Sequence, residues 1–86
     1  MEIKILGSGC TRCEALERVT RKALEELHLD ATIEKIGDIE EILAYGILTT
    51  PGLVINEKVI LSGWVPKMTE LKSLLIANVQ GHAEDM

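Results

Sequence analysis

The feature that most constrains this chain is a pair of cysteines, Cys10 and Cys13, placed after a short apolar run and before a long helical pattern. They are the only cysteines among the 86 residues. Side chains three residues apart are neighbours on a helix, so both sulfurs share one face if a helix begins near Cys10. Unpaired backbone N–H groups at a helix N-terminus favour negative charge, which suits a thiolate. The pattern predicts a thiol–disulfide redox site.

Length, charge and cysteine usage narrow the class of protein. A disulfide between two residues so close closes a loop too short to stabilise a fold, so we expect a reactive bond. The apolar run that opens the chain is too short for a signal peptide or a membrane span. We therefore expect a cytoplasmic protein with no membrane partner. The cytoplasm is reducing, so a C-x-x-C pair there is expected to be catalytic or metal-binding rather than structural. The net charge of −5 argues against a nucleic-acid partner, which needs a basic patch.

The first part of the chain predicts a strand followed by a long helix. An apolar run that ends at Leu6 precedes Gly-Ser-Gly, which is typical of a strand entering a tight turn. Residues 11–28 carry apolar side chains at helical spacing, and their charged residues fall on the other face. Thr11 and Glu14 have the spacing of a capping box, so we expect the helix to be capped there.

The remaining elements are shorter. The β-branched segment 31–36 predicts a second strand, and Asp38 then opens a short helix that Gly46 ends. Two apolar runs, 52–55 and 58–61, are joined at two residues and predict a hairpin. The final segment begins with Pro66, which suits the first turn of a helix, and carries its apolar residues at helical spacing.

The element order is therefore β-α-β-α-β-β-α. Parallel pairing of the first strands needs helical crossovers, and the hairpin pairs antiparallel. We expect an α/β fold with a four-stranded mixed sheet flanked by three helices. It forms one domain over residues 1–80, and residues 81–86 are expected to be a flexible polar tail.

Three features together resemble the thioredoxin-fold superfamily, in particular its small glutaredoxin-like members. They are the C-x-x-C before a long helix, Thr50-Pro51 before the hairpin, and Ser62-Gly63 before the last helix. The likeness covers roughly residues 2–79. It implies a thioredoxin-like fold and an enzyme, a thiol–disulfide oxidoreductase that reduces protein disulfides and carries electrons without a non-protein cofactor.

The resemblance assigns the two sulfurs different roles. Cys10 is implied to be the attacking nucleophile, and Cys13 the resolving thiol. Arg12 stands between them, and we hypothesise that its charge, together with the helix N-terminus, holds Cys10 partly ionised and tunes its pKa. The simpler interpretation is that Arg12 is a solvated helix residue.

Two further segments are implied to bind the substrate. Pro51 is expected to be a cis proline facing the cysteines, and Thr50-Pro51 is expected to pair with the extended chain of a substrate. The alternative is that Thr50-Pro51 is only a strand-entry turn. Gly63 and Trp64 follow the hairpin and are expected to contact substrate, although a tryptophan is more often part of the core.

The chain also departs from the better-known families. Its motif is C-T-R-C, neither the C-G-P-C of common thioredoxins nor the C-P-Y-C of common glutaredoxins. Lys4 stands where larger thioredoxins carry a buried acid. Residues 62–67 offer no carboxylate of the kind that helps glutaredoxins hold glutathione. The run instead resembles small redoxins served by a thioredoxin-type reductase, so we expect that electron donor, and a monomer.

Metal binding is the principal alternative. Residues 7–13 resemble the G-x-x-C-x-x-C loop of heavy-metal-associated domains. The alternative function is therefore a module or metallochaperone that binds Cu(I) or Zn through Cys10 and Cys13. Those domains end on a strand, whereas this chain predicts a final helix, which favours redox chemistry. A metal site shared by two chains and a pair of core cysteines are further alternatives. His28 and His82 are too far apart for a zinc finger, and we expect no metal.

Overall fold

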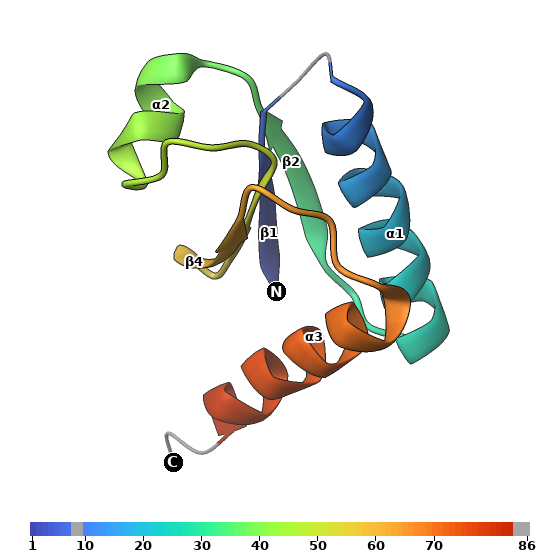
Figure 1. Ribbon diagram of the computed structural model, residues 1–86. Coiled ribbons are helices and arrows are strands. Elements are labelled where there is room, and N and C mark those ends of the chain that lie inside the picture. The colour runs from blue at the N-terminus through green and yellow to red at the C-terminus, as the bar shows by residue number, and fades with distance from the viewer. Residues whose placement is uncertain (8–9, 84–86) are drawn as a thin grey trace.

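The computed structural model describes residues 1–7 and 10–83, and it confirms the expected element order (Figure 1). The strands are β1 (Glu2–Leu6), β2 (Thr32–Ile36), β3 (Gly52–Ile55) and β4 (Lys58–Ser62). The helices are α1 (Thr11–Leu27), α2 (Ile39–Ala44) and α3 (Met68–Ala83). Within the described part of the chain, none of these helices combines the length and apolarity needed to cross a bilayer.

The four strands form one mixed sheet in the order β2-β1-β3-β4. The first two strands are parallel, as their helical crossover requires, and β3 is antiparallel to both β1 and β4. Leu6 pairs with Gly52 at the end of the sheet that leads into the cysteine motif, whereas Ile3 pairs with Ile55 at the other end. The hairpin turn at Asn56 therefore lies at the end of the sheet opposite to the cysteines.

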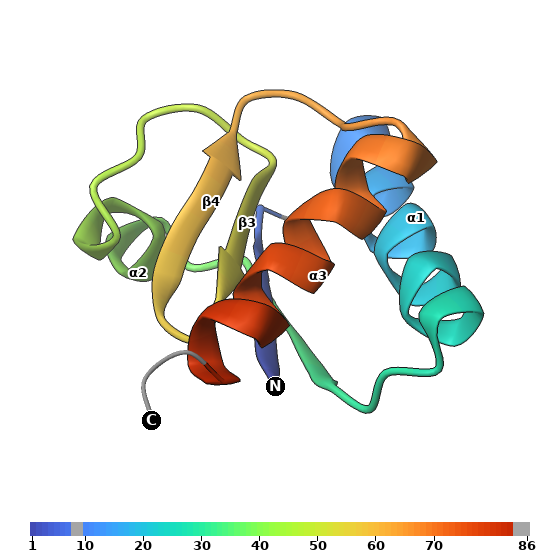
Figure 2. The same cartoon turned by 90° about the horizontal axis from the view of Figure 1, so that it is seen from below.

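Both faces of the two central strands are covered, because side chains alternate between the faces of a strand. Figures 1 and 2 show α1 and α2 on opposite sides of the sheet, with α3 beside α1. The α1/α3 face has a core of Ile3, Ile5, Leu16, Ala23, Leu24, Leu53, Ile55, Leu61, Leu71 and Leu75. The smaller core under α2 comprises Leu6, Ile36, Ile42, Ile47 and Val54. Each fully buried aliphatic side chain contributes about 1.5–3 kcal/mol, so aliphatic residues suffice for this core.

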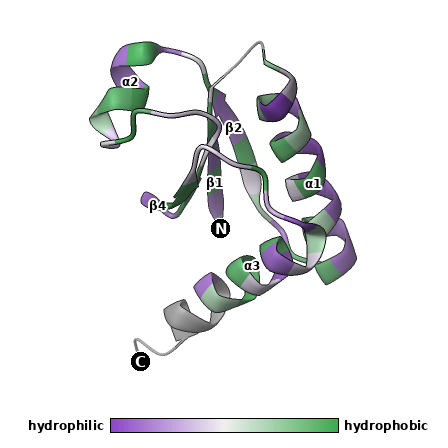
Figure 3. Cartoon of the chain, viewed as in Figure 1, coloured by the Kyte–Doolittle hydropathy of each residue, from purple (hydrophilic) through white to green (hydrophobic). Residues whose placement is uncertain are grey.

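Helices α1 and α2 each bury one stripe, and Figure 3 shows hydrophobic and hydrophilic bands alternating along both. The solvent face of α1 carries an ion pair between Glu17 and Arg21, with 3.0 Å between carboxylate oxygen and guanidinium nitrogen. The expected cap of α2 is confirmed, since the Asp38 carboxylate accepts a hydrogen bond from the backbone N–H of Glu40 at 3.2 Å. Gly46, expected to end this helix, follows it with a positive φ of 82°.

The C-terminal helix is longer than the sequence predicts. Helix α3 ends at Ala83, so residues 81–83 are helical rather than part of a polar tail. A glycine inside a helix costs only about 1 kcal/mol relative to alanine, so Gly81 does not oblige the helix to end. Residues 84–86, the rest of the expected tail, lie outside the described residues.

Candidate dithiol site

Cys10 is the residue that caps α1. Its backbone is extended (φ −123°, ψ 153°), and its sulfur accepts a hydrogen bond from the backbone N–H of Cys13 at 3.1 Å. The sulfur thus occupies the place of the serine or aspartate oxygen that usually caps a helix. The expected capping box at Thr11 is wrong, because Thr11 is already the first helical residue.

The two cysteines differ in exposure and in acidity. Cys10 is half-buried, whereas only 3% of Cys13 is exposed. The pKa of Cys10 is lowered, chiefly because the Cys13 thiol donates a hydrogen bond to it and next because the Cys13 backbone N–H does. The pKa of Cys13 is raised to about 11, chiefly by burial and then by its interaction with Cys10. Cys10 therefore ionises first, at the surface, beside a protonated Cys13.

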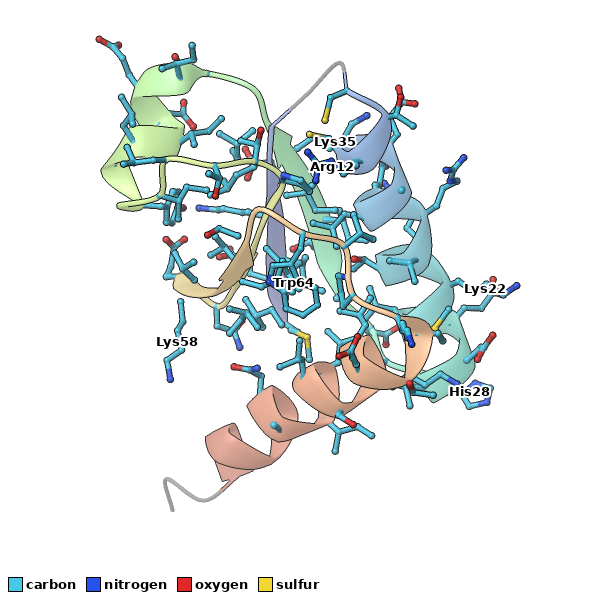
Figure 4. The ribbon with its side chains drawn as sticks, in the orientation of Figure 1. Arg12, Lys22, His28, Lys35, Lys58 and Trp64 are labelled. Atoms are coloured by element: carbon cyan, nitrogen blue, oxygen red, sulfur yellow. The ribbon has the colours of Figure 1, made fainter. Side chains whose placement is uncertain are left out.

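Arg12 contributes less to this acidity than the sequence hypothesis gives it. Its side chain is exposed on the first turn of α1 (Figure 4). Its charge is the smallest of the influences that lower the pKa of Cys10, and its backbone N–H also contributes. The helix N-terminus and Cys13 therefore carry most of the effect, and Arg12 supplements them.

Gly7 lies directly behind the buried sulfur. A Cβ atom placed on Gly7 would stand 2.8 Å from the Cys13 sulfur and 3.0 Å from the Cβ of Thr50. Such distances leave no room for a side chain, and its φ of +112° also favours glycine. The backbone at the end of β1 is therefore the surface on which Cys13 and Thr50 meet. The sequence places Gly7 in a turn and in the loop that resembles metal-binding domains, and it gives no signal of this contact with Cys13 and Thr50.

The segment from Thr50 to Pro51 faces this pair, and its peptide bond is cis, as the resemblance implied. Pro51 is fully buried, whereas Thr50 is exposed. A hydrogen bond from the Thr50 side chain partly offsets the raised pKa of Cys13. The carbonyl oxygen of Pro51 accepts a hydrogen bond from the backbone N–H of Gly63 at 2.7 Å. This hydrogen bond joins the Thr50-Pro51 segment to the segment that carries Gly63, and both were expected to contact substrate.

Trp64 is not brought to the cysteines. Figure 4 shows its side chain away from the N-terminal end of α1, where Arg12 lies. It is 44% exposed, so it is only partly core. The prediction that Trp64 contacts substrate therefore stays a prediction for a part of the substrate away from the cysteines, and its neighbour Gly63 is bonded to the Pro51 segment.

Lys4 is directed toward other partners than the cysteines. Its ammonium donates hydrogen bonds to the Tyr45 hydroxyl at 2.8 Å and to the Glu57 carboxylate at 2.7 Å. These bonds raise the pKa of Lys4. Because Glu57 lies in the hairpin turn, the ammonium points to the far end of the sheet. The side chains of Cys10 and Thr50 influence the pKa of Cys13, whereas the Lys4 ammonium bonds to Tyr45 and Glu57.

The cysteine pair does not by itself supply the ligands of a structural zinc site. Within residues 1–7 and 10–83, no three His, Cys, Asp or Glu side chains gather closely enough to hold a metal ion. A structural zinc site needs four ligands, and one chain supplies two here. The chain also ends on helix α3, unlike the metal-binding domains that its loop resembles.

A dithiol with one accessible, acidified sulfur and one buried sulfur is suited to exchange with other disulfides. The mixed sheet and the cis proline frame that dithiol, which defines the class as the small α/β thiol–disulfide redox proteins. The family model described as "Thioredoxin domain" matches residues 1–76. The chain therefore belongs to the thioredoxin family, and it is a thiol–disulfide oxidoreductase.

Two curated relatives agree with this assignment. The chain is 39% identical over 75 residues to a thioredoxin of Methanothermobacter thermautotrophicus, covering 87% of this chain and 97% of the relative. It is 34% identical over 79 residues to a thioredoxin of Methanocaldococcus jannaschii, covering 92% of this chain and 91% of the relative. The similarity thus extends over nearly the whole length of each protein.

Proposed function

We propose that this protein reduces disulfide bonds in other proteins, with Cys10 as the attacking thiol and Cys13 as the resolving thiol. The observation that carries the proposal is the asymmetry of the pair. Cys10 is accessible and has a lowered pKa, whereas Cys13 is buried and has a raised pKa. Thiolates are the nucleophiles in disulfide exchange, so the first attack falls to Cys10.

The reaction transfers two electrons and two protons. The Cys10 thiolate attacks one substrate sulfur, forms a mixed disulfide and releases the other substrate sulfur as a thiolate. Cys13 then gives up its proton and attacks the Cys10 sulfur, which forms the Cys10–Cys13 disulfide and releases the second substrate thiolate. The two substrate thiolates take up protons from Cys13 and from solvent. Because the second attack is intramolecular, the mixed disulfide is short-lived.

The high pKa of Cys13 does not prevent this second step. Burial raises it, but the hydrogen bond with Cys10 and the charge of Cys10 raise it as well. Both of these contributions need a free Cys10 thiolate, and the mixed disulfide has none. Cys13 therefore becomes more acidic at the stage when it must lose its proton. The hydrogen bond from Thr50 favours the same ionisation.

Thr50, Pro51 and Gly63 form the proposed contact with the substrate chain. Thr50 is exposed, and both Thr50 and Cys13 pack against Gly7. The neighbouring Pro51 is buried in the fold and anchors this segment. An extended chain can bind by strand addition at such a segment. Trp64 is left out of this contact because its side chain lies away from the N-terminal end of α1.

We further propose that a thioredoxin-type reductase, rather than glutathione, restores the dithiol of this monomer in the cytoplasm. Residues 62–67 carry no carboxylate to hold glutathione. A reducing compartment keeps the dithiol in its electron-donating form. Incubating the oxidised protein with glutathione, or with a flavin-dependent reductase and its nicotinamide donor, distinguishes the two sources by the rate at which thiols appear.

A trapping experiment tests the assignment of roles. We expect Cys13→Ser to accumulate a covalent complex with a disulfide-containing protein such as insulin, because the resolving attack is missing. Cys10→Ser is expected to lose disulfide reduction with dithiothreitol as the electron source. Activity of Cys10→Ser would reverse or exclude the proposed roles. Measuring copper and zinc in the purified wild type tests the metal-binding alternative in parallel.

A further inference from the structure

Three large apolar side chains are exposed on α2 and on the segment that connects α2 to the cis proline. Leu48 is 89% exposed, Ile39 70% and Leu43 51%. Ile39 and Leu43 stand four residues apart on α2, so they are neighbours on one helix face. We call Ile39, Leu43, Leu48 and the adjoining Glu40 the α2 surface. Ile39 and Leu43 therefore form one exposed apolar face of α2, and Leu48 lies in the segment that leads from α2 to Pro51. Apolar side chains exposed on one face mark interaction sites more often than scattered ones do.

Buried neighbours in the sequence anchor the α2 surface to the core. Ile42 and Ile47 are buried in the smaller core, on either side of Leu43 and Leu48 in sequence. Pro51, three residues beyond Leu48, is fully buried. Leu48 is therefore fixed between two buried anchors and is held out into solvent. A leucine held in this way is pre-organised for contact with another protein.

The α2 surface is continuous with the proposed substrate contact. Figure 1 shows the segment after α2 running back to the end of the sheet where β1 leads to the cysteine motif. Leu48 precedes Thr50 by two residues, and Thr50 meets Cys13 at Gly7. A protein whose disulfide reaches Cys10 therefore lies within reach of Leu48 and then of α2.

The charged residues of α2 and its N-cap are all acidic, namely Asp38, Glu40 and Glu41. None of the ion pairs within the described residues involves Glu40 or Glu41. Glu40 stands three residues before Leu43, so its carboxylate borders the apolar side chains. The complement of such a surface is apolar and basic.

We infer that the α2 surface docks target proteins whose disulfide is bordered by apolar and basic side chains. This inference rests on the proposed function, and it adds the kind of substrate to it. A second copy of the chain does not fit the same surface, because the net charge is −5 and the acidic sides would face each other. An acidic target is disfavoured for the same reason.

Two disulfide peptides that differ only in their flanking charges test this inference. Each contains one intramolecular disulfide followed by leucine, and then either two lysines or two glutamates. The protein is reduced beforehand and freed of dithiothreitol, and the second-order rate constant (kcat/KM) for its oxidation is measured with both peptides and with dithiodipyridine, which is too small to reach α2. We expect the wild type to prefer the basic peptide about tenfold, and added salt to reduce the preference by screening.

Matched variants separate the surface from general effects. Leu48→Ser and Ile39→Ser are expected to lose several-fold in kcat/KM for the basic peptide and to reduce dithiodipyridine as the wild type does. The control is Ile76→Ser, which removes an exposed apolar side chain from α3. Glu40→Lys is expected to invert the charge preference. Its control is Glu25→Lys, the same charge change on an exposed residue of α1.

The possible results are distinguishable. Equal rates for the two peptides, with dithiodipyridine reduced normally, overturn the inference and leave the proposed function intact. An equal loss in Ile76→Ser and Leu48→Ser overturns it as well, because the effect is then not local. If the wild type reduces none of the three disulfides, the proposed function fails, and the inference fails with it.

Discussion

The backbone N–H of Cys13 donates a hydrogen bond to the Cys10 sulfur at 3.1 Å. The Cys13 thiol donates to the same sulfur and is the largest influence on its acidity. The second cysteine thus prepares the first for attack before it resolves the product. Both bonds arise because the motif places Cys10 at the cap and Cys13 in the first turn, which is a consequence of its two-residue spacing.

The first prediction separates the influences on the pKa of Cys10. Cys13→Ala removes the thiol donor and keeps the backbone N–H, so we expect the pKa of Cys10 to rise toward the ordinary thiol value. Cys13→Ser keeps a hydroxyl donor and is expected to cause a smaller rise. Arg12→Gln removes only the smallest influence, the charge, and is expected to cause the smallest rise of the three. Thiolate absorbance at 240 nm against pH measures all three, and a larger shift in Arg12→Gln than in Cys13→Ala would contradict the assignment.

The second prediction concerns the pH dependence of alkylation. Because the pKa of Cys10 is lowered, its reaction with iodoacetamide is expected to accelerate and level off at a pH below that of a free thiol. Cys13 is expected to stay unmodified in the folded protein until the pH approaches its pKa of about 11. Peptide mapping by mass spectrometry identifies the modified residue at each pH. Modification of Cys13 before Cys10 would reverse the proposed roles.

Much of the site follows from sequence because its parts are local. The C-x-x-C spacing, the apolar run before it and the helical pattern after it fix which sulfurs lie at the start of α1. The Asn56–Glu57 turn has a positive φ at both residues, as a two-residue hairpin requires, and two strand-like runs with such a short connection predict it. Short-range spacing thus supplied the elements and their order.

The parts that sequence did not supply depend on contacts between distant segments. Cysteine is not among the residues that usually cap helices, so Thr11 gave the misleading cap signal. The bond between Gly63 and Pro51 and the direction of the Lys4 ammonium depend on how the sheet is assembled. The position of Trp64 away from the cysteines likewise depends on the path of the chain after β4.

The third prediction tests Gly7 as the surface behind Cys13. Gly7→Ala is expected to destabilise the fold by about 1–2 kcal/mol through its positive φ, and to displace the Cys13 sulfur in addition. Gly46→Ala is the matched control, because Gly46 also has a positive φ but nothing stands within 4 Å of an added Cβ. Both variants are expected to lose stability in urea. Only Gly7→Ala is expected to change the rate at which the mixed disulfide resolves, and an unchanged rate would show that this contact is purely structural.

The fourth prediction concerns Lys4, which stands where larger family members carry an acid. Lys4→Met is expected to leave the pH profile of disulfide reduction unchanged, because the ammonium is bonded to Glu57 and Tyr45. The pKa of Glu57 is lowered by Lys4, so the pair stabilises the fold above the ordinary Glu pKa of 4.5 and this effect is lost as pH falls. The variant is therefore expected to unfold at slightly lower temperature than the wild type at pH 7, with the difference vanishing in acid. A shifted pH profile of activity would instead connect Lys4 to proton transfer.

The last prediction concerns Thr20, a fully buried residue of α1. Its hydroxyl oxygen has no hydrogen-bond partner among the described residues. Leaving a buried polar group unpaired costs about 1–3 kcal/mol, whereas an apolar group of the same shape does not carry this penalty. Valine keeps the branched shape of threonine, so Thr20→Val is expected to raise the free energy of unfolding by about 1 kcal/mol.

Thr69→Val is the control for this substitution, since Thr69 is exposed on α3 and the change there is expected to alter stability by less than about 0.5 kcal/mol. Urea unfolding of both variants under reducing conditions measures the difference without a contribution from the Cys10–Cys13 disulfide. The rate of disulfide reduction is expected to stay at the wild-type value in Thr20→Val. A loss of stability would mean that the Thr20 hydroxyl is satisfied in solution by a bound water molecule, and a loss of activity would connect this buried position to the dithiol along the same helix.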